Sequence, residues 1–417
     1  MLPSRSSSGD VRMRGFRDRT RVIDALAWVD RHAVPLPAEN VTIEVACGRV
    51  LAERVTAAVD VPPFARSAMD GYALRGAETN GAGDYNPLPF QLIGASLPGR
   101  PFTGEVPPGS AIRIMTGAPL PVGADAVLPA EFALEAPDRV SALTSVAPGK
   151  NVGPRGEDVV AGTIVAEASR RLRPQDVGLL ASVGLAEAKV IRRPRVRIIA
   201  TGNELAAPGA PRGAHQIVDS NSLMLAGLVA RDGGIIESQR LVADDREAIR
   251  SALVAPMAEI LLVSGGSSVG VEDHAPTLVA ESGTLAIHGI AMRPSSPAGM
   301  GTVGEALVFL LPGNPVSCLC AYDFFAGRAI RRLGSRSGDW PYAARSAEVS
   351  RKIVSAVGRV DYCRVRLVEG KIEPIATSGA SILSSTTRAD GFVIVPEECE
   401  GYPSGGVVTV YLYDGER

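Results

Sequence analysis

The feature that most restricts the fold is an alternation of strand-like and helix-like segments between about residues 192 and 334. Apolar runs at 196–200, 235–238 and 260–263 have the length and composition of buried strands. Asp219 and Asp244 begin short polar runs between them, of the kind that caps helix starts. Because a crossover helix joins strands that run parallel, the alternation predicts a doubly wound α/β domain with a parallel sheet.

Three short loops stand where the predicted strands end. They are Thr201-Gly202, Ser264-Gly265-Gly266 and Pro312-Gly313-Asn314-Pro315. Doubly wound sheets bind ligands outside the carboxyl ends of their strands. The sequence therefore predicts a pocket where these three loops converge.

The 417 residues exceed what one hydrophobic core usually supports, so several domains are expected. Residues 1–19 are rich in Ser and Arg without an apolar stretch, which predicts a disordered tail rather than a secretory signal. Residues 20–186 alternate short apolar runs with Pro and Gly clusters, which predicts a β-rich N-terminal region of two subdomains, one inserted in the other. The α/β domain is expected at 187–335 and a small β domain at 340–417.

Composition argues against several classes of protein. A formal net charge of −2 and 5% aromatic residues argue against nucleic-acid binding, and no apolar run has transmembrane length. The five cysteines are odd in number and lack Cys-x-x-Cys spacing, and the four histidines show no metal-ligand spacing. A cytoplasmic protein without a disulfide framework or a structural zinc site is expected.

The segment 63–73 does not suit an ordinary helix or strand. Pro62 and Pro63 remove two backbone donors, and Asp70-Gly71 is a turn pair that would let backbone approach a ligand. The pattern predicts an acid presented on a shaped loop. A lone Asp-Gly would much more often be a tight turn between strands, but the residues flanking this one favour the ligand loop.

A second glycine-rich segment follows the predicted strand at 260–263. Residues 264–270 have few bulky side chains, so their backbone amides could cradle a phosphate. The segment is neither a Walker A motif nor a dinucleotide fingerprint, and a structural turn explains it equally well. Asp273, three residues after Gly270, adds an acid and favours the ligand site.

Five carboxylates, Asp70, Asp158, Glu204, Asp219 and Asp273, offer hard oxygen ligands without His or Cys. Such a set suits Mg²⁺ and its phosphate partners, which favours chemistry at a phosphoanhydride. Taken singly, Asp219 is as easily a helix N-cap, and Glu204 is as easily a solvated surface residue.

Six motifs keep the order found in one known family. They are Ser-Ala-Met-Asp-Gly-Tyr-Ala at 67–73, Met-Thr-Gly-Ala at 115–118, Arg-Gly-Glu-Asp at 155–158, Thr-Gly-Asn-Glu-Leu at 201–205, Gly-Gly-x-Ser-x-Gly-x-x-Asp at 265–273 and Leu-Pro-Gly-Asn-Pro-Val-Ser at 311–317. From about residue 23 to residue 410, the chain resembles the molybdopterin molybdenumtransferases, which include MoeA and the E domain of gephyrin. The resemblance implies that the middle domain is a MogA-like, molybdopterin-binding domain and that the C-terminal β domain is barrel-like.

The implied reaction inserts molybdate into adenylated molybdopterin, with Mg²⁺ as cofactor and release of AMP. The implied assembly is a homodimer whose site joins the α/β domain of one subunit to the N-terminal region of the other, with transient contacts to molybdenum enzymes or their chaperones.

The resemblance also implies roles for individual residues. The catalytic residues would be Asp70, Thr116, Glu204, Asp273 and Arg293; the cofactor-binding residues would be Ser67, Asp158, Asp219, Ser264, Gly265, Gly266, Ser268, Gly270, Ser296, Pro312, Gly313 and Asn314; and the metal ligands would be Glu204, Asp219 and Asp273.

The match departs from the family in one functional segment. Typical members carry Lys-Pro-Gly-Lys-Pro where this chain has Arg293-Pro-Ser-Ser296-Pro. Arg293 keeps a positive charge, but Ser296 loses a cation that a doubly charged oxyanion would be expected to need. Val271-Glu272 also shifts one carboxylate by a position.

These departures leave two alternatives open. The chain could be a carrier that binds the cofactor without inserting metal. It could also be a nucleotide-sugar or pyrophosphate hydrolase built on the middle domain alone, against which the long N-terminal region bearing Asp70 and Thr116 argues.

Overall fold

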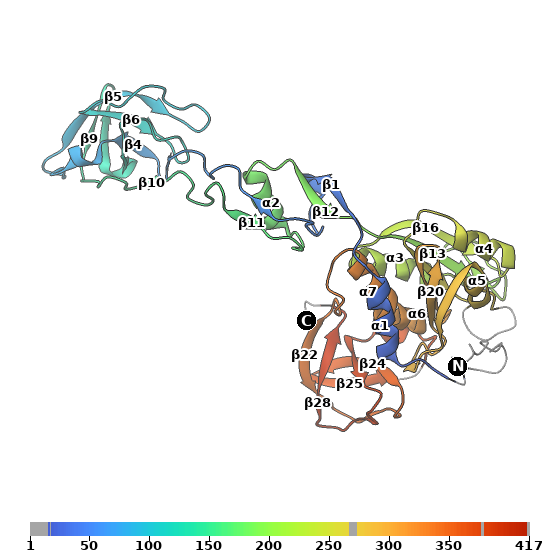
Figure 1. The fold of residues 1–417 in the computed structure, drawn as a ribbon. Helices are drawn as coiled ribbons and strands as arrows, with labels where there is room; N and C mark the ends of the chain where they lie inside the picture. Colours follow the sequence, from blue (N-terminus) through green and yellow to red (C-terminus); the bar gives the residue numbers. More distant parts are fainter. Residues whose placement is uncertain (1–15, 17, 267–272, 377–378, 415–417) are drawn as a thin grey trace, which may run out of the picture. The chain divides into compact units, whose positions relative to one another are not determined.

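The computed structural model describes residues 16, 18–266, 273–376 and 379–414. The chain divides into two compact units (Figure 1). The larger unit combines Met1–Glu39 with Ile191–Arg417, and the smaller unit is Asn40–Val190. Each unit is built around its own sheets and hydrophobic clusters. The predicted tail, residues 1–19, falls almost wholly outside the described residues.

A six-stranded sheet forms the centre of the larger unit. Its order is β16 (Ile235–Val242), β13 (Arg195–Thr201), β17 (Ile260–Ser264), β21 (Ala306–Leu311), β20 (Gly299–Val303) and β18 (Gly283–His288). The first four strands run parallel, as expected, but β20 and β18 run antiparallel to their neighbours. The reason is local: only Gly304 and Glu305 join β20 to β21, and a two-residue connection can only form a hairpin.

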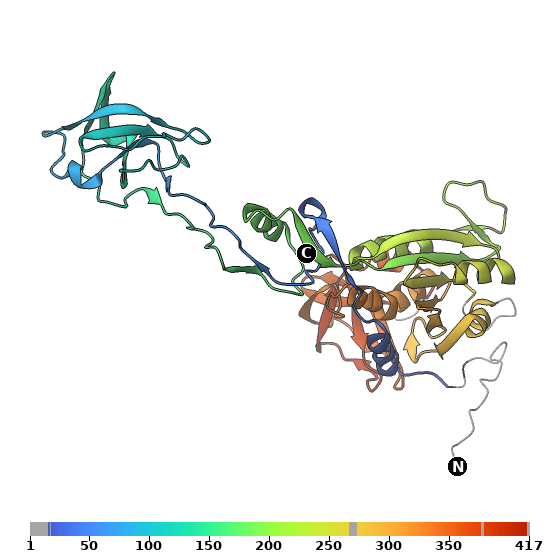
Figure 2. The same cartoon turned by 45° about the horizontal axis from the view of Figure 1, so that its top comes forward.

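Helices cover both faces of this sheet (Figure 2). One face packs against α3 (Asn221–Asp232), α6 (Pro315–Ala321), the π-helical turn Tyr322–Ala326 and α7 (Gly327–Leu333), and the other against α4 (Arg246–Val254) and α5 (Ala275–Ser282). Alternation along β13 explains the two layers. Ile198 joins the α3 side and Ile199 joins the α4 and α5 side, since successive strand side chains point to opposite faces. The doubly wound architecture is confirmed.

The first helix in the described part of the chain is α1 (Val22–His32). Its buried face, Val22, Ala25 and Val29, belongs to the same hydrophobic cluster as α3 and α7. The sequence analysis placed this segment in the N-terminal region, whereas the helix packs within the larger unit. Nothing in the local pattern of a short amphipathic helix says which sheet its apolar face will cover.

The C-terminal part of the larger unit is a β domain. Its main sheet has the order β19 (Met292–Arg293), β24 (Val360–Val368), β26 (Gly391–Val395), β28 (Val407–Leu412) and β22 (Ala343–Glu348), with β25 (Lys371–Ala376) paired to β24. A short pair, β23 (Ile353–Val354) and β27 (Gly401–Tyr402), and the helix α8 (Ser384–Thr387) complete it. Strand β19 is contributed by the α/β domain, so the two domains share a sheet.

The smaller unit contains a six-stranded sheet ordered β7 (Ala126–Pro129), β4 (Gly71–Leu74), β6 (Ser110–Ile114), β5 (Leu88–Ser96), β9 (Arg139–Ala142) and β8 (Ala133–Ala136). Both faces of β4 are covered, because Leu74 and Ala73 lie in different hydrophobic clusters. Short apolar runs bounded by Pro and Gly therefore did indicate β structure here.

A second hydrophobic cluster of the smaller unit draws on both ends of its sequence. It joins Ile43 and Leu51 to Leu172, Leu180 and Val190, around α2 (Pro174–Ser182) and the pair β2 (Val55–Thr56) with β11 (Ile164–Ala166). The remaining short elements are β1 (Ala38–Thr42), β3 (Arg66–Ser67), β10 (Val152–Gly153) and β12 (Glu187–Ile191). The strands of the six-stranded sheet, residues 71–142, therefore lie in the sequence between the two segments that form the cluster around α2.

No helix in the described ranges is long and apolar enough to cross a membrane. All five cysteines are free, and Cys318 and Cys320 are buried in the core of the larger unit.

Candidate functional site

A pocket of about 590 Å³ lies at the carboxyl ends of the parallel strands. The three loops expected to converge do so: the pocket is lined from the loops after β13, β17 and β21, together with the start of α3. Its lining includes Thr201, Gly202, Glu204, Asp219, Asn221, Asp244, Ser264, Gly265, Gly266, Asp273, Pro297, Pro312, Gly313, Asn314 and Ser381.

Close packing explains the glycines of this pocket. Gly265 and Gly266 have φ values of +93° and +55°, in the left-handed region. A Cβ atom on Gly265 would lie 2.3 Å from the carbonyl oxygen of Thr201, and one on Gly313 would lie 3.5 Å from the Cα atom of Gly265. Gly265 therefore must be a glycine for its loop to pass so close to Thr201, whereas a Cβ at position 313 would make only an ordinary contact.

Asn221 ties two of the loops together. Its Nδ2 donates to Ser264 Oγ at 2.9 Å and to the carbonyl oxygen of Gly313 at 2.8 Å. The side chain is nearly buried, and its remaining polar atom, Oδ1, has no hydrogen-bond partner among the described residues. Thr201 Oγ1 is likewise buried without a partner in the described part of the chain.

Buried polar atoms are rarely left unpaired, because each one costs about 1–3 kcal/mol. Thr201 and Asn221 both line the pocket, so a ligand could satisfy both atoms. Our sequence reasoning treated Asn221 only as a helix-start residue and Thr201 only as part of a motif. Their positions at a strand end and a helix start were the available signal.

The three proposed metal ligands line the pocket, but their oxygens have different surroundings. Asp219 Oδ1 accepts a hydrogen bond from the Ser222 amide at 3.0 Å, so Asp219 does cap α3. The Glu204 carboxylate lies over Gly202, and its Oε2 is 2.7 Å from the position that a Cβ atom on Gly202 would occupy. Among the described residues, no three Asp, Glu, His or Cys side chains come together to hold a metal ion.

Ser264 connects the pocket to the core behind it. Its hydroxyl lies 3.8 Å from Cys318 Sγ, and burial raises the pKa of the Cys318 thiol to about 12. A thiol with so high a pKa stays protonated at neutral pH and is a poor nucleophile. Cys318 therefore packs behind the pocket and does not contribute a reactive group.

Arg293 does not line this pocket. Its guanidinium is paired with Asp361 of the C-terminal β domain. Ser296 is partly buried, and its Oγ is buried without a partner among the described residues, while the next residue, Pro297, lines the pocket. The segment that departs from the family pattern thus reaches the pocket through Pro297, which follows Ser296, rather than through Arg293.

In the smaller unit, the structure brings Asp70 and Thr116 together. Asp70 Oδ1 accepts hydrogen bonds from the amide and from the hydroxyl of Thr116, each at 2.7 Å. These two bonds, the backbone one first, hold the pKa of Asp70 below its ordinary value. Both residues are exposed, so Asp70 presents an ionised carboxylate to solvent.

The residues around Asp70 build its loop. Ser67 is buried, and its hydroxyl donates to the carbonyl oxygen of Met69 at 2.5 Å, so this side chain holds the turn. Gly71 begins β4, where a Cβ would lie 2.0 Å from the carbonyl oxygen of Leu128. The expectation that Gly71 serves the approach of a ligand is corrected: strand packing requires a glycine there.

Asp158 is exposed, and its amide donates to the carbonyl oxygen of Val61 at 2.9 Å. Ser268, Gly270, Val271 and Glu272 lie outside the described residues.

Three family models match successive parts of the chain. They are described as "MoeA N-terminal region (domain I and II)", "Probable molybdopterin binding domain" and "MoeA C-terminal region (domain IV)", and they match residues 20–184, 197–332 and 346–413. The chain is also 33% identical to molybdopterin molybdenumtransferase 2 of Mycobacterium tuberculosis over 410 residues, which are 96% of this chain and 99% of that protein. The chain belongs to the molybdopterin molybdenumtransferase family.

A second member of the molybdopterin molybdenumtransferase family, from Haemophilus influenzae, is 31% identical over 385 residues, 90% of this chain and 94% of that protein. The crystal structure of the molybdopterin biosynthesis MoeA protein from Pyrococcus horikosii matches with a TM-score of 0.79 and 31% identity, covering 95% of this chain and all of that one. The resemblance drawn from the six motifs is therefore confirmed, as is the multidomain α/β fold with β-rich terminal regions.

Proposed function

We infer that this chain is a molybdopterin molybdenumtransferase, which inserts molybdate into adenylated molybdopterin and releases AMP during biosynthesis of the molybdenum cofactor. One observation carries the inference. The chain shares nearly its full length with relatives of that name, and its pocket holds two buried polar atoms, Thr201 Oγ1 and Asn221 Oδ1, without partners among the described residues.

The pocket suits a ligand that carries phosphate and hydrogen-bonding groups. Gly266 has no side chain of its own that would hinder a phosphate beside its backbone, whereas the Gly265 amide already donates to the carbonyl oxygen of Leu311 at 3.2 Å. Asn221 Oδ1 can only accept, so it would pair with an N–H or O–H of the substrate, and the Thr201 hydroxyl can donate or accept. In the proposed reaction, the anhydride between AMP and the molybdopterin phosphate breaks, AMP leaves, and water supplies the oxygen that completes the remaining phosphate.

We propose that Asp70, Thr116, Glu204 and Asp273 serve the reaction and that Mg²⁺ is required. The pocket offers hard oxygens that suit Mg²⁺, of which Glu204, Asp219 and Asp273 are the residues we expect at the ion. The described residues supply no ready cluster of three ligands, so the ion would take most of its ligands from substrate phosphates and water. When bound, it would neutralise phosphate charge.

We also propose that the protein acts as a homodimer in the cytoplasm and transiently meets molybdenum enzymes or their chaperones, as the family resemblance suggests. The five free cysteines agree with a reducing compartment.

One observation favours the carrier function instead. No lysine or arginine is among the described residues that line the pocket, although a dianion is the substrate. A pocket without a cation would bind the cofactor more readily than it would concentrate molybdate.

The experiment that separates these functions measures AMP release from adenylated molybdopterin by the purified protein, with molybdate and Mg²⁺ present or omitted. We expect release that depends on both ions, and none after chelation with EDTA. Tight binding of adenylated molybdopterin without AMP release would contradict the transferase and support the carrier. A Ser296→Lys variant would then test whether restoring the family lysine creates turnover.

A further inference from the structure

Strands β4 and β6 of the smaller unit carry Asp70 and Thr116 at the same end of their pairing. The two strands run antiparallel, and Tyr72 lies directly opposite Arg113. Asp70 immediately precedes β4, and Thr116 follows β6 after a single intervening residue. The hydrogen bonds between Asp70 and Thr116 therefore depend on how firmly this end of the strand pair is held.

One carboxylate joins the two strands at this position. Glu135 of β8 accepts hydrogen bonds from the Tyr72 hydroxyl and from the Arg113 guanidinium, whose Nε lies 3.2 Å from Oε2. Burial first, and Glu135 second, raise the pKa of Tyr72, so its hydroxyl stays protonated and donates. The hydrogen bonds from Tyr72 and then from Arg113 lower the pKa of Glu135, so the acceptor is ionised. Both bonds are thus charge-assisted.

Glu135 reaches β4 because the sheet curls. Strands β7 and β8 lie at opposite edges of the strand order, yet only Ala130–Phe132 separate them in sequence. This short connection brings β8 back toward β4, where the amide of Ala130 donates to the carbonyl oxygen of Asp70 at 3.1 Å. The stretch from residue 130 to residue 135 therefore contacts the Asp70 end of β4 twice, once through the backbone and once through Glu135.

The buried tyrosine distinguishes this contact from an ordinary surface ion pair. An exposed pair of arginine and glutamate contributes little, because water screens the charges and both side chains lose freedom. Here the Tyr72 ring is buried in the hydrophobic cluster that contains Leu74 and Leu128, so it cannot follow the carboxylate if Glu135 moves. The shared carboxylate is therefore fixed from the core side, and it holds Arg113 from there.

We propose that Glu135 is a positioning residue that acts through Asp70. By holding β4 and β6 together, it keeps the Asp70 carboxylate on Thr116 and in one orientation toward the substrate. The proposal rests on the proposed transferase function, in which Asp70 serves the reaction. Displacement of such a group by about 1 Å is enough to cost a large factor in rate.

The first test measures hydrogen–deuterium exchange of the Thr116 amide by NMR in the full-length protein and needs no substrate. Glu135→Ala should raise the exchange rate of this amide about tenfold, because Asp70 would hold it for less of the time. Glu135→Gln should raise it less, since a glutamine oxygen can still accept from Tyr72. The amides that join β5 to β9 should exchange as in the wild type, which separates a local effect from loss of the fold.

The matched control is Glu105→Ala. Glu105 forms an ion pair at 3.7 Å with Arg75, which follows the other end of β4. The variant removes a surface carboxylate that pairs with an arginine beside the same strand, and it should leave exchange of the Thr116 amide unchanged.

The second test is steady-state AMP release. Glu135→Ala should lower kcat about tenfold, while the Kd for adenylated molybdopterin stays within about twofold. A double variant with Asp70→Ala should be no slower than Asp70→Ala alone, because Glu135 acts through Asp70. A merely structural loss would slow the double variant further.

Three results would each overturn the proposal: unchanged exchange of the Thr116 amide in Glu135→Ala, an equal effect of Glu105→Ala, or a double variant slower than Asp70→Ala. The two levels of inference fail in different ways. If the wild-type protein releases no AMP with molybdate, the transferase function fails, whereas exchange of the Thr116 amide still decides whether Glu135 positions Asp70.

Discussion

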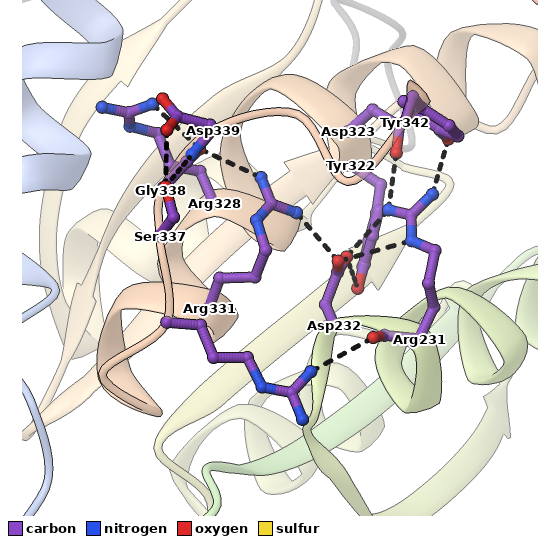
Figure 3. A network of polar contacts seen from close by, with 11 residues as sticks. Arg231, Asp232, Tyr322, Asp323, Arg328, Arg331, Ser337, Gly338, Asp339 and Tyr342 are labelled. Carbon is purple, nitrogen blue, oxygen red and sulfur yellow. Dashed lines mark hydrogen bonds and ion pairs between the residues drawn. The ribbon is translucent and has the colours of Figure 1, made fainter. Parts of the chain in front are cut away.

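The larger unit contains a ligand pocket and a buried charge network. The two differ in how their buried polar side chains are paired. In the network, Asp232 and Asp323 have no exposed side-chain surface, yet both are well supplied with donors (Figure 3). Arg231 Nη2 lies 2.8 Å from both carboxylates, Arg331 pairs with Asp232 at 2.9 Å, and Tyr342 donates to Asp323 at 2.8 Å. In the pocket, by contrast, Thr201 and Asn221 keep buried atoms unpaired among the described residues.

The paired charges of the network stabilise the fold, whereas the unpaired atoms of the pocket serve ligand binding. Buried ion pairs join α3, the π-helical turn and α7, although Arg331 Nε has no partner among the described residues, so removing one carboxylate should loosen the fold. Unpaired polar atoms at a pocket destabilise the fold by about 1–3 kcal/mol each, and they persist because a ligand can use them. Substitutions in the network should therefore change stability first, and substitutions in the pocket should change binding first.

The largest effect is expected for Asp232→Ala. It leaves Arg331 buried without its carboxylate partner and takes one of two carboxylates from Arg231, which should lower the free energy of unfolding by about 3–5 kcal/mol. Chemical unfolding followed by far-UV circular dichroism measures it. The control is Asp245→Ala, which removes the exposed cap of α4 and should cost only about 1 kcal/mol. A loss for Asp232→Ala no larger than the control would show that the network does not stabilise the unit.

A smaller effect should distinguish two buried threonines. Thr201→Val removes an unpaired buried hydroxyl, so we expect the free energy of unfolding to rise by about 1–3 kcal/mol while the Kd for adenylated molybdopterin rises about tenfold. Thr79→Val is the matched control, because the Thr79 hydroxyl donates to Gly76 at 2.6 Å and accepts from Val146 at 2.8 Å. It should cost about 1–3 kcal/mol and leave affinity unchanged. Titration calorimetry measures the Kd, and thermal melting measures the stability of each variant. Weaker binding by Thr79→Val and unchanged binding by Thr201→Val would contradict the assignment of Thr201 to the pocket.

The smallest effect concerns Asp70 and pH. Its pKa is lowered by the Thr116 hydrogen bonds, so the carboxylate stays ionised above its ordinary pKa of 3.8 and loses these bonds only as pH falls through the lowered value. The Thr116 amide resonance should therefore not titrate between about pH 5 and 8, and the midpoint of its shift should lie below 3.8. Asp70→Asn should abolish that acid titration. A midpoint above 3.8 would mean that Thr116 does not stabilise the charged form.

Much of the architecture and part of the site follow from local sequence. Glycines such as Gly265 and Gly313 indicated where loops could approach, and Asp219 was correctly weighed as a helix cap. The Asp70 loop was correctly seen as shaped, although Gly71 serves strand packing. The assigned domain boundaries and site roles, including Arg293, stay predictions.

The sequence by itself determined the order of strands and helices, the loops at the sheet edge and the family, because propensity, capping and turn chemistry act between near neighbours in the chain. Only the tertiary structure decided which polar atoms lack partners and which charges pair. Arg293 meets Asp361 across 68 residues, and Thr201 and Asn221 are isolated by what packs around them. Such contacts depend on how whole elements pack, and no local pattern encodes that packing.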